Sequence, residues 1–288
     1  MLAPDSPSAS SSSSSSSTDS SKRAAFYTLA RAEPADARRL VDIEFRAFAH
    51  EPANQLLSFR DYTEPAHVDR AVALYAAALG SSSSSSPLHP ASVRSPAAKR
   101  AQASTRVSFL KVTDADARGA IVSFAKAEFK QYSLAELRSP ADSGHEHEPR
   151  MNRDWFALNE GLRRAYVGLS KHCYIGMLAT QPRHQHNGAG TLLLAALLAE
   201  ADQAGMEVYL ESTGTAKPLY ERHGFVAVNE VRFEPGEYGV YDVGGERQTV
   251  MVRGALGRDG VRRGVRGWEA AVAGTEAAVR RAARGARR

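Results

Sequence analysis

The sequence predicts an α/β domain, a sheet flanked by helices, and three observations indicate it. Short apolar runs of strand length alternate with longer segments whose apolar residues recur at helical spacing. One run, residues 174–180, leads through a loop containing Gly188 and Gly190 into an apolar helix predicted over 192–204. The chain has 288 residues, of which 43% are hydrophobic, so it carries enough apolar surface for a substantial core.

The first half of the predicted domain holds a strand, two helices and a hairpin. The strand is residues 26–31, and Pro34 then begins a helix whose apolar face is Ala37, Leu40, Val41 and Phe48. Thr63 caps a second helix, which ends at Gly80 and turns inward Val68, Val72, Tyr75 and Leu79. Two strands follow at 107–112 and 120–129, joined by a hairpin loop at 113–119.

The second half is expected to begin with a helix over 152–169, whose inward residues are Trp155, Leu158, Leu162, Tyr166 and Leu169. The strand 174–180 and the helix 192–204 come next, and Gly205 ends that helix. A strand at 207–211, a short helix carrying Tyr220 and a final antiparallel pair at 226–233 and 248–253 complete the domain.

Two serine runs and a basic end divide the chain into one domain and three low-complexity segments. We expect a disordered serine-rich N-terminus at residues 1–25, because serine offers no apolar surface to offset chain entropy. The domain spans residues 26–253 and contains a low-complexity insert at about 81–104. Residues 254–288 are expected to form a basic C-terminal tail outside the domain.

The positive charge of the chain is concentrated at its end. From Arg253 to Arg288 ten arginines face three acids, a net charge of +7, whereas the whole chain carries +5. The body is therefore slightly acidic and presents no basic binding face. A solvated tail is one interpretation, and weak association with nucleic acid or an acidic membrane surface is the alternative.

Several classes of protein are disfavoured by the sequence. No apolar segment follows Met1 and no eighteen apolar residues run together, so we expect neither a secretory signal nor a membrane span. The single cysteine, Cys173, is expected in the core rather than as a nucleophile, and it fits a cytoplasmic or nuclear protein that is not secreted. His145 and His147 lie in a polar loop without helical ligand spacing, so no metal site is expected.

The loop between the strand and the helix predicts an anion site. Its pattern is Q-x-x-G-x-G, from Gln185 through Gly188 to Gly190. Glycines let the backbone approach a ligand, and a helix start contributes about half a positive charge. Arg183 can add a counter-ion, as can His184 and His186 when protonated. A dinucleotide-binding fingerprint lacks its third glycine here, and no Gly-Lys-Ser/Thr of a P-loop is present, so we predict a pyrophosphate cradle of another kind.

This pattern resembles the acetyl-coenzyme A signature of the GNAT superfamily of N-acetyltransferases. A second segment, L-Y-E-R-H-G-F from Leu219 to Phe225, is similar to the other hallmark of that family, a short helix that carries a tyrosine and ends at Gly-Phe. The resemblance covers about residues 26–253, and the order of elements with the serine-rich insert looks most like fungal members. It implies a GNAT-type mixed sheet that is splayed between its central strands.

The resemblance also implies acetyl-CoA as cosubstrate and a set of residues that hold it. The pantetheine arm would pair with the backbone of Leu178, Ala179 and Thr180. The pyrophosphate would lie on the loop and helix start formed by Gln185, His186, Asn187, Gly188, Ala189, Gly190 and Thr191. Because these groups act through their backbone, the side chains of Asn187 and Ala189 are given no chemical role.

The implied reaction is direct transfer of the acetyl group to an amine, and it needs a base and an acid. A family base is commonly a carboxylate on the central strands, but residues 172–180 contain none. Glu211 is the first candidate and Glu128 the second, although Glu211 also fits a solvated or ion-paired strand end. Tyr220 matches the family's tyrosine and is expected to protonate the leaving thiolate, the alternative being packing against the cofactor.

The sequence thus predicts an N-acetyltransferase that moves the acetyl group of acetyl-CoA to an unidentified amine acceptor. The alternative is a catalytically silent CoA-binding module that recognises a partner through its basic tail. His223 is expected at a helix end on the surface, without a role in either.

Overall fold

The computed structural model describes residues 26–59, 64–81, 105–141 and 149–285. These residues form a seven-stranded sheet in the order β1-β2-β3-β4-β5-β7-β6, in which every neighbouring pair is antiparallel except β4 and β5. The strands are β1 Tyr27–Arg31, β2 Arg106–Asp114, β3 Ala120–Lys130, β4 His172–Thr180, β5 Glu207–Ser212, β6 Val226–Phe233 and β7 Glu246–Arg253. The predicted mixed α/β fold is therefore confirmed.

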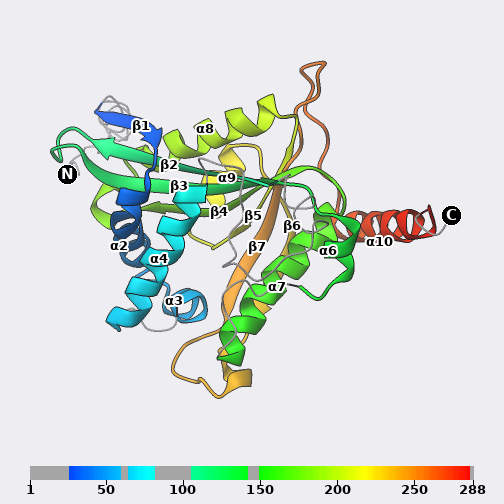
Figure 1. Ribbon diagram of the computed structural model, residues 1–288, viewed down its shortest axis with the longest axis horizontal. Coiled ribbons are helices and arrows are strands. Elements are labelled where there is room, and N and C mark those ends of the chain that lie inside the picture. Colours follow the sequence, from blue (N-terminus) through cyan, green and yellow to red (C-terminus); the bar gives the residue numbers. More distant parts are fainter. Residues whose placement is uncertain (1–25, 60–63, 82–104, 142–148, 286–288) are drawn as a thin grey trace, which may run out of the picture.

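Helices cover both faces of this sheet (Figure 1). In that view α8 lies above the strands, while α2, α3, α4 and α7 lie below them. The long helices are α2 Ala37–Ala47, α3 Pro52–Phe59, α4 Pro65–Ser81, α7 Arg150–Val167, α8 Ala189–Gln203 and α10 Trp268–Gly285. Shorter helical segments are η1 Pro34–Asp36, α6 Leu134–Arg138, η3 Pro182–His184, α9 Lys217–Arg222 and η4 Pro235–Tyr238.

The core divides into layers that follow these faces. One apolar cluster joins α8 and α9 to strands β2 to β5, and a second joins α2 and α4 to β2 and β3. A third joins α7 and α10 to β5 and β7. Cys173 lies in the first cluster as a fully buried free thiol, and its burial raises its pKa to about 12. It is a core residue, as expected.

Several elements differ from the sequence-based expectation, among them α7, which spans Arg150–Val167 rather than 152–169. Helix α8 begins at Ala189 rather than at 192, because Gly188 adopts φ +91 and ends the preceding loop there. Helix α3 was not expected, since its eight residues are too few to show a helical period. The predicted cap Thr63, the N-terminus at 1–25, most of the insert and the histidine-containing loop at 142–148 lie outside the described residues.

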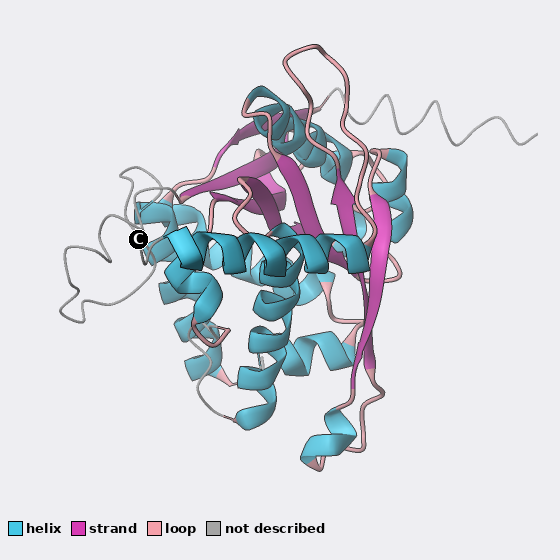
Figure 2. Ribbon diagram, turned by 90° about the vertical axis from the view of Figure 1, so that its right-hand side faces the viewer, coloured by secondary structure: helices cyan, strands magenta, loops and turns pink. Residues whose placement is uncertain are grey.

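The basic tail differs most from its expectation, because its described part folds onto the domain. Helix α10 packs against α7, with Ala271 fully buried and the Trp268 ring stacked 5.9 Å from that of Tyr166. Figure 2 shows α10 as the long helix that crosses in front of the other elements. The Tyr166 hydroxyl donates to the Arg266 carbonyl at 2.9 Å. Residues 254–285 are therefore not a detached appendage, because apolar side chains of this basic segment pack against α7.

A second contact fixes the segment that leads into α10. Asp202, at the end of α8, accepts hydrogen bonds from Arg253 at 2.8 and 2.9 Å and from Arg262 at 2.9 and 3.0 Å. These two cations lower the pKa of Asp202 to about 2 although burial opposes them. Two of the ten arginines counted at this end of the sequence are thus bound within the domain.

Within the ranges that the structure describes, no helix combines the length and the apolar character that a membrane crossing requires. Among the same residues, no three His, Cys, Asp or Glu side chains are grouped so as to hold a metal ion.

Candidate active site

The central strands β4 and β5 separate after three residue pairs. They pair in parallel only at His172–Glu207, Cys173–Val208 and Tyr174–Tyr209, and β4 then continues to Thr180 with β3 as its partner. Gly176 is an extra residue in the β3–β4 register, which makes a β-bulge at the point of separation. A Cβ at Gly176 would lie 3.0 Å from the Tyr174 ring, so any other residue would require that ring to shift. The result is the splay that the sequence resemblance implied.

The loop after β4 forms an anion cradle at the start of α8. The first hydrogen bond of this helix runs from Leu192 N to Gly188 O at 3.0 Å, so the N–H groups of Ala189, Gly190 and Thr191 have no acceptor within the helix. The first turn contains no acidic residue, and Gly188 supplies no side-chain cap. A helix start of this kind attracts an anion, as the pattern predicted.

The loop itself is held in place by contacts at both ends. Gln185 donates from Nε2 to the Thr180 carbonyl at 3.2 Å, which closes the loop over the end of β4. His186 adopts φ +60, a left-handed conformation that is uncommon for a residue with a side chain. His184 lies 3.2 Å from Asp114, so this side chain is engaged with a carboxylate rather than available as a phosphate counter-ion.

The edge of β4 that faces the splay leads from this cradle into the sheet. Leu178, Ala179 and Thr180 pair with β3 on one side, while β5 has already diverged on the other. The side chain of Ala179 is buried in the core, so this residue presents only its backbone to the splay. An unpaired strand edge followed by unpaired helical N–H groups fits an extended amide chain that ends in a pyrophosphate, which is the chemistry of coenzyme A.

A cavity of about 390 Å³ lies where the strands separate. It is bordered by β4 from Tyr174 to Leu178, by the end of β5 and by the face of the sheet that α2, α4 and α7 cover. Glu211 and Tyr220, the two predicted catalytic residues, both line it. The structure therefore brings together side chains from β5 and α9 that are separate in the sequence.

Tyr220 is buried and faces this cavity from α9. Its ring makes an edge-to-face contact with Phe225 at 5.6 Å between centroids. Desolvation raises the pKa of its hydroxyl, so the group is protonated at neutral pH. The tyrosine thus packs in the core and also lines the cavity.

Glu211 combines burial with an unsatisfied oxygen. Its Oε1 atom has no hydrogen-bond partner among the described residues. Burial raises the pKa of this carboxyl, while the positive charge of Arg163 and hydrogen bonding by Tyr174 act in the opposite direction. A carboxylate whose pKa is raised is a stronger base than one in water.

Glu128, the second candidate base, has the opposite properties. Burial raises its pKa, but the charges of Lys126 and Arg163 outweigh burial and lower the pKa to about 2. Lys126 also forms an ion pair with it at 3.1 Å. Glu128 is not among the residues that line the cavity, so this geometry favours Glu211.

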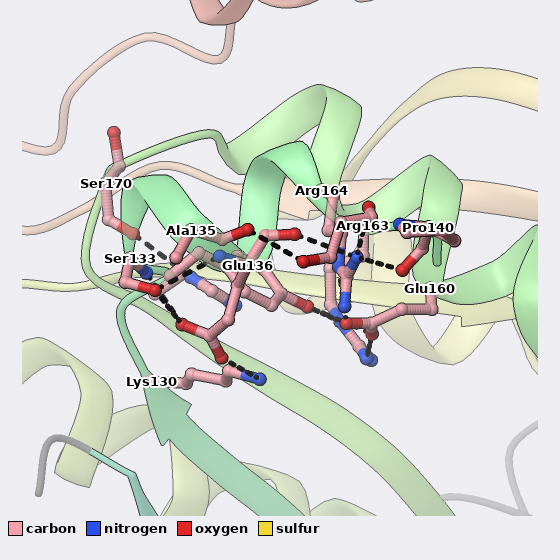
Figure 3. Close-up of polar contacts among 12 residues, drawn as sticks. Lys130, Ser133, Ala135, Glu136, Pro140, Glu160, Arg163, Arg164 and Ser170 are labelled. Atoms are coloured by element: carbon pink, nitrogen blue, oxygen red, sulfur yellow. Dashed lines mark hydrogen bonds and ion pairs between the residues drawn. The ribbon is translucent and has the colours of Figure 1, made fainter. Parts of the chain in front are cut away.

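Figure 3 shows Arg163 of α7 in a polar network with Glu160 and Arg164. Arg163 donates from Nε to the Tyr132 hydroxyl at 2.8 Å, forms an ion pair with Glu160 and lies 3.7 Å from the centre of the Tyr174 ring. Arg164 bonds the second oxygen of Glu160 at 2.8 Å. The sequence analysis did not single out Arg163; its position eight residues after Trp155, on the inward side of the predicted helix, was the available signal.

Glu44 is a second residue that the sequence analysis missed. It lies on α2, is 1% exposed and lines the cavity. Its Oε2 atom accepts a hydrogen bond from the Tyr75 hydroxyl, and burial raises its pKa to about 8. The signal was present, because position 44 lies four residues after Leu40 and four before Phe48 on the predicted apolar face. Burying a carboxylate at a core position costs free energy, which indicates a functional role for this residue.

Comparisons with known proteins agree with this architecture. A family model described as an acetyltransferase (GNAT) domain matches residues 142–237. The uncharacterized N-acetyltransferase YafP of Escherichia coli (strain K12) is 30% identical over 80 residues, which are 28% of this chain and 50% of that protein. The chain thus matches about half the length of this curated relative.

One of two similar solved structures shows the same fold, at low sequence identity. The mosquito arylalkylamine N-acetyltransferase-like protein 5b has a TM-score of 0.52 at 14% identity, covering 78% of this chain and 98% of that one. The Salmonella typhimurium protein yncA, solved with its cofactor acetyl-CoA, has a TM-score of 0.43 at 17% identity, covering 83% of this chain and 99% of that one.

The splayed sheet and the anion cradle after β4 have the arrangement that an extended phosphate-bearing ligand would require. The family match covers residues 142–237, which include β4, β5 and β6. This part of the chain is a GNAT-type acetyltransferase domain.

Proposed function

We propose that the protein is an acetyl-CoA-dependent N-acetyltransferase that transfers the acetyl group directly to a primary amine. One observation carries the proposal: Glu211 and Tyr220 line the same cavity at the point where β4 and β5 separate. The β4 edge and the start of α8 would hold acetyl-CoA through the backbone of residues 178–180 and 188–191. When bound there, acetyl-CoA supplies the thioester carbonyl that the amine attacks.

The acceptor needs a base because alkylamines are protonated at neutral pH. A lysine-type amine has a pKa near 10.4, so converting it to its neutral form at pH 7 costs about 4.6 kcal/mol. Glu211 is the proposed base, acting directly or through one water. Its raised pKa and its unpartnered Oε1 atom support this role.

Tyr220 is the proposed acid that protonates the leaving thiolate. Its raised pKa keeps the hydroxyl protonated, and its ring is fixed by burial against Phe225. The other function considered, a silent CoA-binding module that recruits a partner through the basic tail, is favoured by no observation. Part of that tail is engaged in packing against α7.

The test is release of free thiol from acetyl-CoA by the full chain with a panel of primary amines, against a blank without acceptor. In Tyr220→Phe, kcat should fall about 10²- to 10⁴-fold, since the ring remains and only the donated proton is lost. The affinity for acetyl-CoA should stay the same. Tyr241→Phe is the matched control, because that side chain is 83% exposed. Absence of thiol release with every amine would contradict the proposed function.

A further inference from the structure

The cavity at the splay has walls of an unusual composition for its size. Six aromatic side chains line it: Phe48, Tyr75, Trp155, Phe156, Tyr174 and Tyr220. Two carboxylates, Glu44 and Glu211, face it from different elements. Aromatic walls suit a carbon chain or a cation above a ring face, and each buried carboxylate requires a donor.

Glu44 is the carboxylate that the proposed reaction does not use. Its Oε1 atom has no hydrogen-bond partner in the part of the chain that the structure describes, although its Oε2 atom is bound to Tyr75. Lys126 is the cation whose charge acts on Glu44, but the Lys126 ammonium is paired with Glu128 at 3.1 Å. An unpaired oxygen in a buried carboxylate is costly, and a ligand that donates to it would remove the cost.

The two carboxylates reach the cavity from different elements. Glu44 of α2 is near Lys126 of β3, whereas Glu211 lies near the end of β5, and β4 lies between these two strands in the sheet. The cavity segment between them is formed by the bulged part of β4 and by the aromatic rings. An acceptor that extends across this cavity from the β5 side toward Lys126 can therefore meet both carboxylates.

Two basic side chains of α4, His67 and Arg70, also line the cavity. Both are half-buried and have interactions elsewhere in the molecule. They lie on the same helix as Tyr75, so they are placed along the α4 wall rather than on β5. They do not supply the missing donor to Glu44 Oε1.

We propose that the acceptor is a diamine: one nitrogen is acetylated beside Glu211 while Glu44 binds the second nitrogen as an ammonium. This inference rests on the proposed function and adds the class of substrate. Glu44 is then the specificity-determining residue, because a monoamine that reaches the splay leaves its Oε1 atom unsatisfied. A hydrogen bond to a charged group accounts for roughly a 10- to 100-fold preference.

The experiment compares α,ω-diaminoalkanes of three to six carbons with the monoamines of the same length. With the wild-type chain, kcat/KM for at least one diamine should exceed that for its matched monoamine by about 10- to 100-fold. In Glu44→Gln, which keeps the shape of the side chain, this ratio should fall to within about threefold of unity. Asp42→Asn is the control, since it makes the same acid-to-amide replacement two residues away on α2, at a residue outside the cavity wall.

A binding measurement supplies a second readout. With a pKa of about 8, Glu44 is mostly protonated at pH 7, so binding an ammonium should release up to about one proton. Calorimetry in buffers of different ionisation enthalpy measures this release, which should be smaller by that amount in Glu44→Gln. Acetylation of monoamines as efficient as that of every diamine, or a diamine preference that persists in Glu44→Gln, would overturn the proposal. Either result would leave the acetyltransferase function standing, whereas no turnover with any amine would refute that function itself.

Discussion

Replacing Trp268 with alanine should lower the free energy of unfolding by about 2 kcal/mol. Core Trp→Ala changes cost roughly 3–5 kcal/mol, and Trp268 is half-buried, so about half of that value applies. Its stacking on Tyr166 adds about 0.5–1.5 kcal/mol. Alanine favours the helix by about 0.5 kcal/mol, which offsets part of the loss. For a domain of this size the net change corresponds to a fall in Tm of roughly 4–8 °C.

Urea unfolding followed by tryptophan fluorescence and circular dichroism measures this change. Tyr241→Ala is the control, because it removes an aromatic side chain that is 83% exposed and should shift stability by less than about 0.5 kcal/mol. If Trp268→Ala behaves like this control, α10 does not stabilise the domain and the original interpretation of a detached tail is correct.

Two further predictions concern the cradle and the base. Gly190→Glu should abolish acetyl-CoA binding measured by calorimetry, whereas Gly190→Gln, which adds no charge, should weaken it less. A Cβ at this position would lie 3.7 Å from Thr180 Oγ1, so both variants can fold. A folded Gly190→Glu variant with full affinity would contradict the cradle assignment. The rate should rise with pH as Glu211 ionises, and the raised pKa of Glu211 places this limb above its usual range. Arg163→Gln removes a positive charge near Glu211, so it should raise the pKa of Glu211 further and move the rise in rate to higher pH. Arg163→Lys keeps the charge and should move the rise less. Coincident pH–rate profiles of the folded variants would show that Arg163 does not act on Glu211.

The fold was largely predictable because its elements carry local signals. The strand before the cradle, the Gly188 turn and the apolar helix after it are adjacent in sequence, so their order and spacing define the central motif. The docking of α10 was not predictable in the same way. An alanine-rich, arginine-rich segment with three glycines has no strong period, and only the tertiary contact with Tyr166 and its neighbours shows where the helix packs.

The residues of the candidate site differ in the same way, because some carry local sequence signals and others depend on tertiary packing. Tyr220 and the cradle residues follow from motifs within short segments, and Glu211 from its place at the end of the next strand. Glu44 and Arg163 come from helices distant in sequence, and their importance depends on burial against β3 and β5. Burial of a charged side chain is a tertiary property, so periodicity marks such residues as unusual without identifying their partners.

The cradle and most of the cavity wall are formed by helices on different faces of the sheet, so the two sites can be altered separately. The cradle belongs to α8 and the loop before it, whereas the cavity walls come largely from α2, α4 and α7. Substitutions on those three helices can reshape the pocket for a different acceptor without touching the backbone groups at the start of α8. Variant libraries that change acceptor specificity can therefore be confined to α2, α4 and α7, while the proposed acetyl-CoA site at the start of α8 is left unchanged.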